Sequence, residues 1–370
     1  MTALTRLRLK DFRNYETLAL DLDGRHVCLF GANGAGKTNL LEAISQLGPG
    51  RGLRSAKLTE LTRHGAPDGW TVSATLDDRR IGVGLETEGT GAKRVIRLDG
   101  APAQAGDLAD LVRIVWLTPA MDSIFRGGAS DRRRFFDRQV MSHIPSHGQA
   151  AARYERAMRE RNALLERGHV DPAWADAIET RMAEAGAELA VNRASVLENL
   201  QAAVDARPEG YFPKGDLSLE GDAEAAAIRG EDFKTIFETL SETYRSMRRR
   251  DMAAGRTLSG PHRSDLTVIH RPTGMVAGDA STGQQKALLI GLILASAGAL
   301  SRDESGPAPL LLLDEAAAHL DADRRAALFE ELDALPGQSW LTGTERFLFE
   351  AFGDRAQQIE VSAGGAHISD

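Results

Sequence analysis

Cysteine is nearly absent from this sequence of 370 residues, since Cys28 is the only one. A single thiol excludes an internal disulfide and any metal site built from several cysteines. Its apolar surroundings, 27–30, are typical of a small buried side chain. Long apolar runs are also missing: the best candidate, 287–300, is too short and too rich in small residues to cross a bilayer. The N-terminus has no apolar segment of the secretory type. We therefore expect a cytoplasmic protein with no membrane partner.

An excess of basic charge is missing as well, because the formal net charge is −8. This argues against a protein that coats nucleic acid non-specifically. It does not argue against a local basic surface, because a polyanion contacts a local patch of charge and does not respond to the net charge of the whole protein. The segment 126–168 departs from the average, with ten arginines against five acidic residues. The chain length predicts two or three domains, or one large domain with an insertion.

The order of secondary-structure patterns indicates an interrupted α/β fold. Short apolar or alternating runs predict strands at 6–9, 27–30, 71–76, 81–85, 94–98 and 114–117. After about Phe125 the pattern becomes helical, with segments at 149–167, from Pro172 onward and at 233–247. Strands return at 267–269, 310–313 and 340–342. We predict an α/β body, residues 1–125 and 252–370, interrupted by a mainly helical insertion at 126–251.

A glycine-rich segment after residue 30 is the most specific motif. It matches G-x-x-x-x-G-K-[ST] completely, between an apolar run and an apolar helical stripe, which is the context that the motif requires. In such a loop, backbone N–H groups and a helix N-terminus converge on nucleotide phosphates. Lys37 adds a positive charge, and the Thr38 hydroxyl can coordinate Mg²⁺. The segment reads Gly31-Ala32-Asn33-Gly34-Ala35-Gly36-Lys37-Thr38 and predicts an ATP site.

A second motif lies at 310–315. Its four leucines predict a central parallel strand, and Asp314 at the carboxyl end of that strand can hold Mg²⁺ through water. Glu315 is placed to polarise an attacking water. We therefore predict Lys37, Asp314 and Glu315 as catalytic residues, with Thr38 and Asp314 as the Mg²⁺ ligands.

Two further segments resemble motifs of the ATP-binding cassette (ABC) ATPases. The segment 281–286 resembles their signature motif, and Ala318-His319-Leu320-Asp321 resembles their D-loop. In that superfamily the signature serine and glycine of one head cap the γ-phosphate bound by another, so the resemblance implies an ATP-dependent homodimer. An ordinary helix N-cap is a second, compatible role for Ser281. The implied nucleotide contacts are Gly31, Asn33, Gly34, Gly36, Lys37, Thr38, Asn39, Ser281, Gly283, Gln284 and Asp321.

Several stretches narrow the resemblance to the RecF family of bacterial recombination mediators. They are Leu9 to Tyr15, the continuation of the phosphate loop through Ile44, Ser130 to Asp137 and Ser259 to Leu266. The resemblance implies an ABC-type head with a helical second lobe and no long coiled coil. It also implies binding of double-stranded DNA near junctions with single strands, and work with RecR and RecO to help load RecA.

The sequence departs from ABC patterns at two places. No glutamine lies between Leu117 and Phe125, and 341–344 lacks the switch histidine of transporter-type proteins. Both gaps suggest a slow, switch-like ATPase, and the resemblance implies a weak ATPase activity that DNA stimulates. They also disfavour a transporter subunit, and intact Lys37, Thr38, Asp314 and Glu315 disfavour a non-ATPase scaffold. The remaining alternative is the head of another SMC- or Rad50-like protein, although an insertion of about 125 residues holds no long coiled coil.

Several basic residues have two open interpretations. Arg133 and Arg134 are either part of a solvated helix face with i,i+3 ion pairs or contacts to DNA or to a neighbouring head. Arg51 and Arg54 are either surface charge or contacts to DNA phosphates. The pair 262–263 is either a satisfied part of the core or a relay toward the nucleotide.

Overall fold

The computed structural model describes residues 2–88, 91–167, 171–318 and 320–369. The chain forms two compact units. The first comprises Met1–Asp122, Glu209–Phe212 and Leu289–Asp370, and the second comprises Ser123–Pro208 and Pro213–Leu288. The predicted fold class, an α/β body with a mainly helical insertion, is confirmed. The longest helix of the described residues has 35 residues, so this part of the chain contains no long coiled coil.

The second unit extends further along the chain than the boundary at 251/252 that the sequence predicts. Strand β10 (Asp265–His270) pairs along its whole length with β9 (Gly215–Glu220). This pairing lies within the second unit, and the whole segment 252–288 belongs to that unit and not to the first. The apolar pattern at 267–269 predicts the strand correctly but gives no information about its partner.

One sheet of the first unit is antiparallel, with the strand order β2-β1-β4-β5-β6-β7. In β1 and β4 buried residues alternate with exposed or half-buried ones, as expected for a sheet with one face on the core. The strands are β1 (Leu4–Phe12), β2 (Tyr15–Asp21), β4 (Thr71–Leu76), β5 (Arg79–Glu88), β6 (Gly91–Leu98) and β7 (Ala101–Ala103).

The other sheet of this unit has the order β15-β14-β3-β13-β12-β8, and all its pairs are parallel except β14 with β15. The strands at 114–117 and 310–313 are wholly apolar and buried, as strands of a parallel sheet covered on both faces are, and Cys28, in the strand at 26–30, is buried as predicted. The strands are β3 (His26–Phe30), β8 (Ile114–Leu117), β12 (Leu310–Leu313), β13 (Ser339–Gly343), β14 (Ala356–Ser362) and β15 (Gly365–Ile368).

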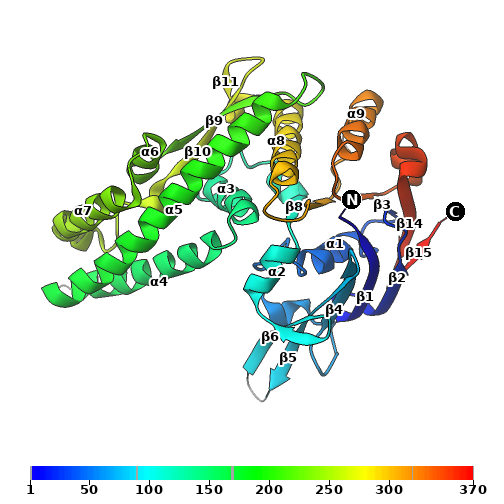
Figure 1. Ribbon diagram of the computed structural model, residues 1–370, viewed down its shortest axis with the longest axis horizontal. Helices are drawn as coiled ribbons and strands as arrows, with labels where there is room; N and C mark the ends of the chain where they lie inside the picture. Colours follow the sequence, from blue (N-terminus) through cyan, green and yellow to red (C-terminus); the bar gives the residue numbers. More distant parts are fainter. Residues whose placement is uncertain (1, 89–90, 168–170, 319, 370) are drawn as a thin grey trace. The chain divides into compact units, whose positions relative to one another are not determined.

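Helix α1 (Lys37–Ser45) joins the two sheets in one core, because its Leu40, Leu41 and Ile44 pack with residues of both (Figure 1). The remaining helical elements of the unit lie at its periphery. They are η1 (Leu58–Leu61), α2 (Ala105–Leu111), η2 (Pro119–Met121), α9 (Ala322–Asp333) and η5 (Arg346–Arg355).

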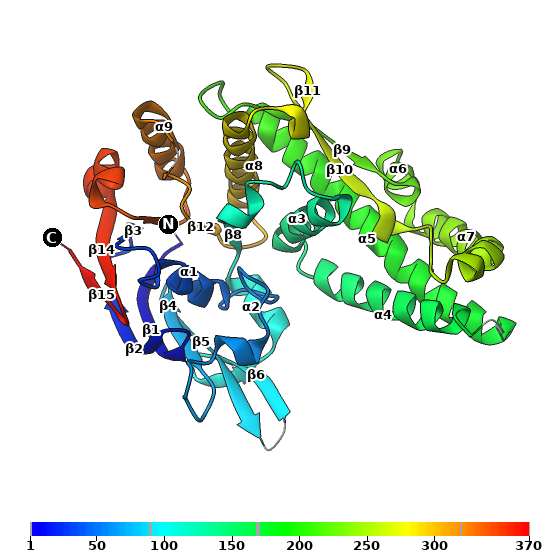
Figure 2. The same cartoon turned by 180° about the vertical axis from the view of Figure 1, so that it is seen from behind.

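The second unit is built around the long helix α5, with α4, α6 and α7 packed on it in an apolar core and β9 running along it (Figure 2). Its third strand, β11 (Met275–Val276), pairs with β10. The helical elements are α3 (Ala129–His143), α4 (His147–Leu165), α5 (Pro172–Ala206), α6 (Asp222–Ile228), α7 (Phe233–Ala254), η3 (Pro261–Arg263) and η4 (Ala277–Asp279).

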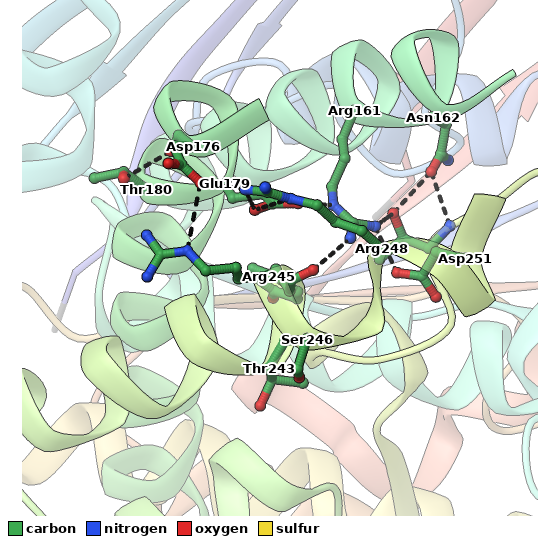
Figure 3. A network of polar contacts seen from close by, with 12 residues as sticks. Arg161, Asn162, Asp176, Glu179, Thr180, Thr243, Arg245, Ser246, Arg248 and Asp251 are labelled. Carbon is green, nitrogen blue, oxygen red and sulfur yellow. Dashed lines mark hydrogen bonds and ion pairs between the residues drawn. The ribbon is translucent and has the colours of Figure 1, made fainter. Parts of the chain in front are cut away.

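A buried ionic network ties three of these helices together (Figure 3). Arg161 of α4 is only 1% exposed. Its Nε donates to Glu179 of α5 (3.0 Å), and its Nη1 donates to Asp251 of α7 (2.6 Å) and to the Thr257 hydroxyl (2.8 Å). Arg248 supplies a second guanidinium to Glu179. Each buried charge in the network has a partner, and removal of one member would leave another buried charge uncompensated.

Helix α8 (Thr282–Arg302) begins in the second unit and continues into the first. By length and composition alone it could cross a membrane, but 78% of its apolar window is buried within the protein, as in the core helix of a water-soluble fold.

Candidate nucleotide site

The phosphate loop of residues 31–36 connects β3 to α1, so the backbone reaches the helix N-terminus directly from a buried strand. Three of its glycines have positive φ angles: Gly31 (144°), Gly34 (79°) and Gly36 (121°). A Cβ at Gly31 would overlap the Val361 carbonyl. These are conformations and close approaches that only glycine accommodates well.

The floor of the loop is held by two residues that the phosphate-loop pattern does not include: Asn14, in the turn between β1 and β2, and Tyr15, the first residue of β2. A Cβ at Gly36 would meet the Tyr15 hydroxyl at 2.5 Å and Asn14 Nδ2 at 2.6 Å. Asn14 donates to the Ala35 carbonyl (3.2 Å) and accepts from Asn39 Nδ2 (2.7 Å). Asn39, a predicted nucleotide contact, therefore supports the loop through its hydrogen bond to Asn14.

Lys37 is the first residue of α1 and only 6% exposed. Its Nζ donates to the carbonyls of Gly31 (2.6 Å) and Ala32 (2.9 Å), which holds the ammonium over the loop. Burial lowers the pKa of Lys37, and the nearby carboxylates of Glu315 and Asp314 oppose that shift. The positive charge is thus available to phosphate oxygens bound by the loop.

The acidic pair follows β12, and the structure brings it to the phosphate loop as predicted. Thr38 Oγ1 donates to Asp314 Oδ1 at 3.0 Å, so a hydroxyl and a carboxylate oxygen converge although 276 residues separate them in sequence. This donor set suits Mg²⁺, which prefers oxygen ligands. Burial raises the pKa of Asp314, while hydrogen bonds from Thr342 and Thr38 oppose the rise. A bound cation would favour the ionised carboxylate further.

Thr342 completes this arrangement, and the sequence motifs do not identify it. Its hydroxyl donates to Asp314 Oδ1 (2.8 Å) and accepts the backbone N–H of Glu315 (2.8 Å). Glu315 has a φ of 52°, a conformation unusual for a residue other than glycine. Strand β13 lies between β3 and β12, and this places Thr342 between the phosphate loop and the acidic pair. The absence of a switch histidine at 341–344 is the only sequence signal near it.

The signature residues lie at the start of α8, on the second unit. Ser281 and Gln284 form a reciprocal capping box: Gln284 N donates to Ser281 Oγ (3.3 Å), and Ser281 N donates to Gln284 Oε1 (3.0 Å). Ser281 and Gly283 are exposed, so this helix N-terminus is open to an anion from outside. Asp321 caps α9 by accepting from Arg324 N (2.8 Å), and His319 lies outside the described residues.

The four arginines predicted as DNA contacts are placed differently from one another. Arg51 is exposed, and Arg54 donates to the buried Glu42 (3.2 Å) and to Asn39 (3.0 Å). Arg133 is half-buried and donates to the Ser264 carbonyl (2.7 Å), whereas Arg134 is exposed and forms an i,i+3 ion pair with Asp131.

The pair 262–263 is divided between core and surface. His262 is half-buried and Arg263 is exposed. His262 Nε2 donates to the Thr257 carbonyl (3.1 Å), which leaves Nδ1 to accept from the Tyr154 hydroxyl (2.8 Å). Burial lowers the pKa of His262 to about 4, so the ring is neutral at pH 7. For His262, this satisfied position agrees with the core interpretation.

Together the fold and the site define a P-loop nucleotide-binding head of the ABC type, because a strand–loop–helix phosphate cradle faces an acidic pair on a parallel strand of the same sheet. The chain matches the family model described as RecF/RecN/SMC N terminal domain over residues 3–350.

Comparisons of the whole chain identify the family. The chain is 52% identical over 371 residues to the DNA replication and repair protein RecF of Rhizobium meliloti (strain 1021), covering 98% of this chain and 97% of that protein. It is 51% identical over 368 residues to the RecF of Brucella suis biovar 1 (strain 1330), covering 98% and 95%. A solved structure of the recombination mediator protein RecF-ATP in the RecFOR pathway has the same fold, with a TM-score of 0.84 at 23% identity, covering 100% of this chain and 98% of that one. The chain belongs to the RecF family.

Proposed function

We propose that this protein is an ATP-dependent DNA-binding protein of recombinational DNA repair and replication, with slow ATP hydrolysis. The observation that carries the proposal is the connected set of Thr38, Asp314, Thr342 and Glu315 at the phosphate loop. The names of the RecF relatives supply the repair context.

In the proposed reaction, Lys37 and the backbone N–H groups of residues 31–36 bind the nucleotide phosphates. Thr38 and Asp314 hold Mg²⁺, which neutralises charge on the phosphates when bound. Glu315 orients and polarises the attacking water. Its carboxylate is half-buried, and its backbone is fixed by Thr342, so its position is set before the nucleotide arrives.

Dimerisation on ATP is the second part of the proposal. The exposed N-terminus of α8, with Ser281, Gly283 and Gln284, supplies a hydroxyl, a backbone donor and a helix dipole to the γ-phosphate bound by a second copy. Asp321 of the D-loop segment, exposed at the start of α9, contributes at the same interface. ADP lacks the γ-phosphate, so it leaves the α8 N-terminus without a ligand.

The proposed partners follow from the family. The dimer binds double-stranded DNA near junctions with single strands and acts with RecR and RecO to help load RecA, in the cytoplasm and at the nucleoid. Of the four arginines predicted to contact DNA, Arg51, Arg54 and Arg134 are exposed, and Arg133 is half-buried. Arg54 and Arg133 would have to exchange existing contacts for phosphates.

The alternative is the ATPase head of another SMC- or Rad50-like protein. Such a head carries a long coiled coil, and the relation to the curated RecF proteins over 98% of this chain favours the first proposal.

Glu315→Gln tests the proposal, because it keeps the shape of the side chain and its backbone contacts but cannot polarise water. We expect this variant to bind ATP, to hydrolyse it at a small fraction of the wild-type rate and to accumulate dimers on duplex DNA. Glu350→Gln, an exposed substitution of the same kind, is the matched control. Hydrolysis by Glu315→Gln at the wild-type rate would show that the activating base lies elsewhere.

A further inference from the structure

The antiparallel sheet of the first unit has a second face that the nucleotide site does not use. Its outward residues include four arginines, Arg6 and Arg8 on β1, Arg80 on β5 and Arg97 on β6, together with Ser73 and Thr75 on β4. We call this group the basic sheet face. Arg6, Arg80 and Arg97 are exposed, and the others are half-buried.

The strand register places these residues in two rows. In one row Arg8 lies opposite Ser73, Ser73 opposite Gly82, and Gly82 opposite Arg97. In the other, Arg6 lies opposite Thr75, and Thr75 opposite Arg80. Neighbouring strands are about 4.8 Å apart, so the arginines of β1 lie about 10–14 Å from those of β5 and β6. Two pairs of guanidinium groups therefore flank a strip of hydroxyls.

The strip between the arginine pairs is hollow, with a cavity volume of about 270 Å³. Gly82 keeps its floor low. A Cβ at Gly82 would meet no atom closer than 3.8 Å, so the packing of the sheet does not require glycine there. Glycine in a strand interior weakens the strand, and it often marks a place where a ligand approaches the backbone closely.

The basic sheet face carries an excess of positive charge. Asp21 is shared by Arg6 (3.0 Å) and Arg8 (3.0 Å), so one carboxylate serves two guanidinium groups. The side chains of Arg80 and Arg97 make no hydrogen bond or ion pair within the described part of the chain, although the Arg80 backbone N–H donates to Asp99 (2.9 Å), which places one carboxylate beside Arg80. A protein with a net charge of −8 thus has a concave face with the opposite sign.

We propose that the basic sheet face binds the phosphodiester backbone of duplex DNA, with the backbone of one DNA strand lying in the hollow between the two arginine pairs. The proposal rests on the DNA-binding function proposed above and adds a contact surface to it. Guanidinium groups from both sides and hydroxyls from below are suitable donors for phosphate oxygens.

The composition of the face distinguishes between possible anionic ligands. The six residues that define it include no aromatic ring, and single-strand binding surfaces rely on aromatic stacking. They include no large apolar side chain either, whereas the centres of protein–protein interfaces are apolar or aromatic. Duplex DNA presents its phosphates outward and requires neither.

The test is the affinity of the full chain, with ATP, for duplex DNA over a range of salt concentrations. Because Arg80 and Arg97 make no side-chain hydrogen bond or ion pair with the described residues, the Arg80→Ala/Arg97→Ala variant should fold normally. We expect duplex affinity to fall about tenfold and the slope of log K against log salt to decrease by about two, one for each lost phosphate contact. Arg256→Ala/Arg302→Ala removes the same charge from two other exposed arginines and should have little effect.

A second variant tests the hollow without changing the charge. Gly82→Val should fill the floor, leave thermal stability unchanged or slightly higher, and weaken duplex binding. ATP binding by each variant, measured separately, should equal that of the wild type.

Four outcomes would overturn the inference, and each has its own meaning. If the wild type binds duplex DNA and both variants bind it equally well, this surface is not a DNA contact, while the proposed function stands. If the wild type does not bind duplex DNA with ATP, the proposed function itself fails. A loss for oligo(dT) as large as for duplex would assign the face to single strands. An equal loss for polyglutamate would assign it to acidic proteins.

Discussion

Thr342→Val tests directly how the nucleotide site is built. Valine has nearly the shape of threonine, but it removes the hydroxyl that donates to Asp314 and accepts the N–H of Glu315. Thr342 is 0% exposed, so water cannot replace the lost partner without a rearrangement.

The two lost contacts determine the magnitude. A hydrogen bond to a carboxylate contributes about 1.5–3 kcal/mol, and a buried N–H left without an acceptor costs about 1–3 kcal/mol. Asp314 keeps the hydroxyl of Thr38 at 3.0 Å, which limits the loss at the carboxylate. We therefore expect the free energy of unfolding to fall by about 3 kcal/mol.

The effect on turnover follows from the φ of 52° at Glu315. A left-handed conformation at such a residue costs roughly 1–2 kcal/mol, and the hydrogen bond to Thr342 helps to maintain it. Without that bond, the carboxylate leaves its position, and turnover of ATP should fall by about tenfold, since 1.36 kcal/mol corresponds to a factor of ten.

The assay compares urea unfolding and ATP turnover for wild type, Thr342→Val and Thr342→Ser. Serine keeps the hydroxyl and loses one methyl group, so it should lose only about 1 kcal/mol and retain most of the turnover. A valine variant that loses less than about 1 kcal/mol and hydrolyses ATP normally would refute the positioning role of Thr342.

Four further predictions concern other parts of the chain. Lys37→Ala should abolish tight ATP binding in a nucleotide titration, because the charge beside the phosphates is lost. Ser281→Arg should bind ATP as a monomer but fail to dimerise in sedimentation with ATP, with ADP as the control. The pKa of His262 falls from its ordinary 6.5 to about 4 on folding, because burial disfavours the charged ring. Its contribution to stability is therefore full above pH 6.5 and is lost as the pH falls toward 4. The melting temperature should fall over that pH window, and it should fall less steeply in His262→Gln. Arg161→Ala should destabilise the protein by about 3–5 kcal/mol in urea unfolding, because it leaves the buried carboxylate of Asp251 without its guanidinium partner. Arg181→Ala, at an exposed ion pair, should cost less than about 1 kcal/mol.

The parts of the site that are continuous in sequence could be predicted, and the parts assembled by strand order could not. The phosphate loop and the acidic pair each occupy one short segment with a recognisable residue pattern. Thr342 acts only because β13 lies between β3 and β12, and no periodicity reveals the order of parallel strands. Asn14 and Tyr15 support the loop from another sheet, for the same reason.

Similar limits apply to the fold. Strands with apolar runs, such as 310–313, could be predicted, whereas β9 and β14 are missed because few of their residues are apolar. Charge patterns left the role of Arg133 open, because a sequence does not show that its guanidinium meets the Ser264 carbonyl 131 residues away.

The sheet that carries the phosphate loop also constrains when the protein can become functional during synthesis. Strand β3 ends at Phe30, and its neighbours β13 and β14 begin at Ser339 and Ala356, so about 300 residues separate partners that hydrogen-bond side by side. At about 5–20 residues per second, the ribosome needs roughly 15–60 s to deliver them after β3 is made. During that interval β3 lacks both neighbours, and Glu315, which is made only shortly before β13, has no anchor until β13 follows. The helices α3 to α7 are complete earlier, so they can fold while the nucleotide site does not yet exist. A nascent chain gains its ATP site only after β13 and β14 have left the ribosome.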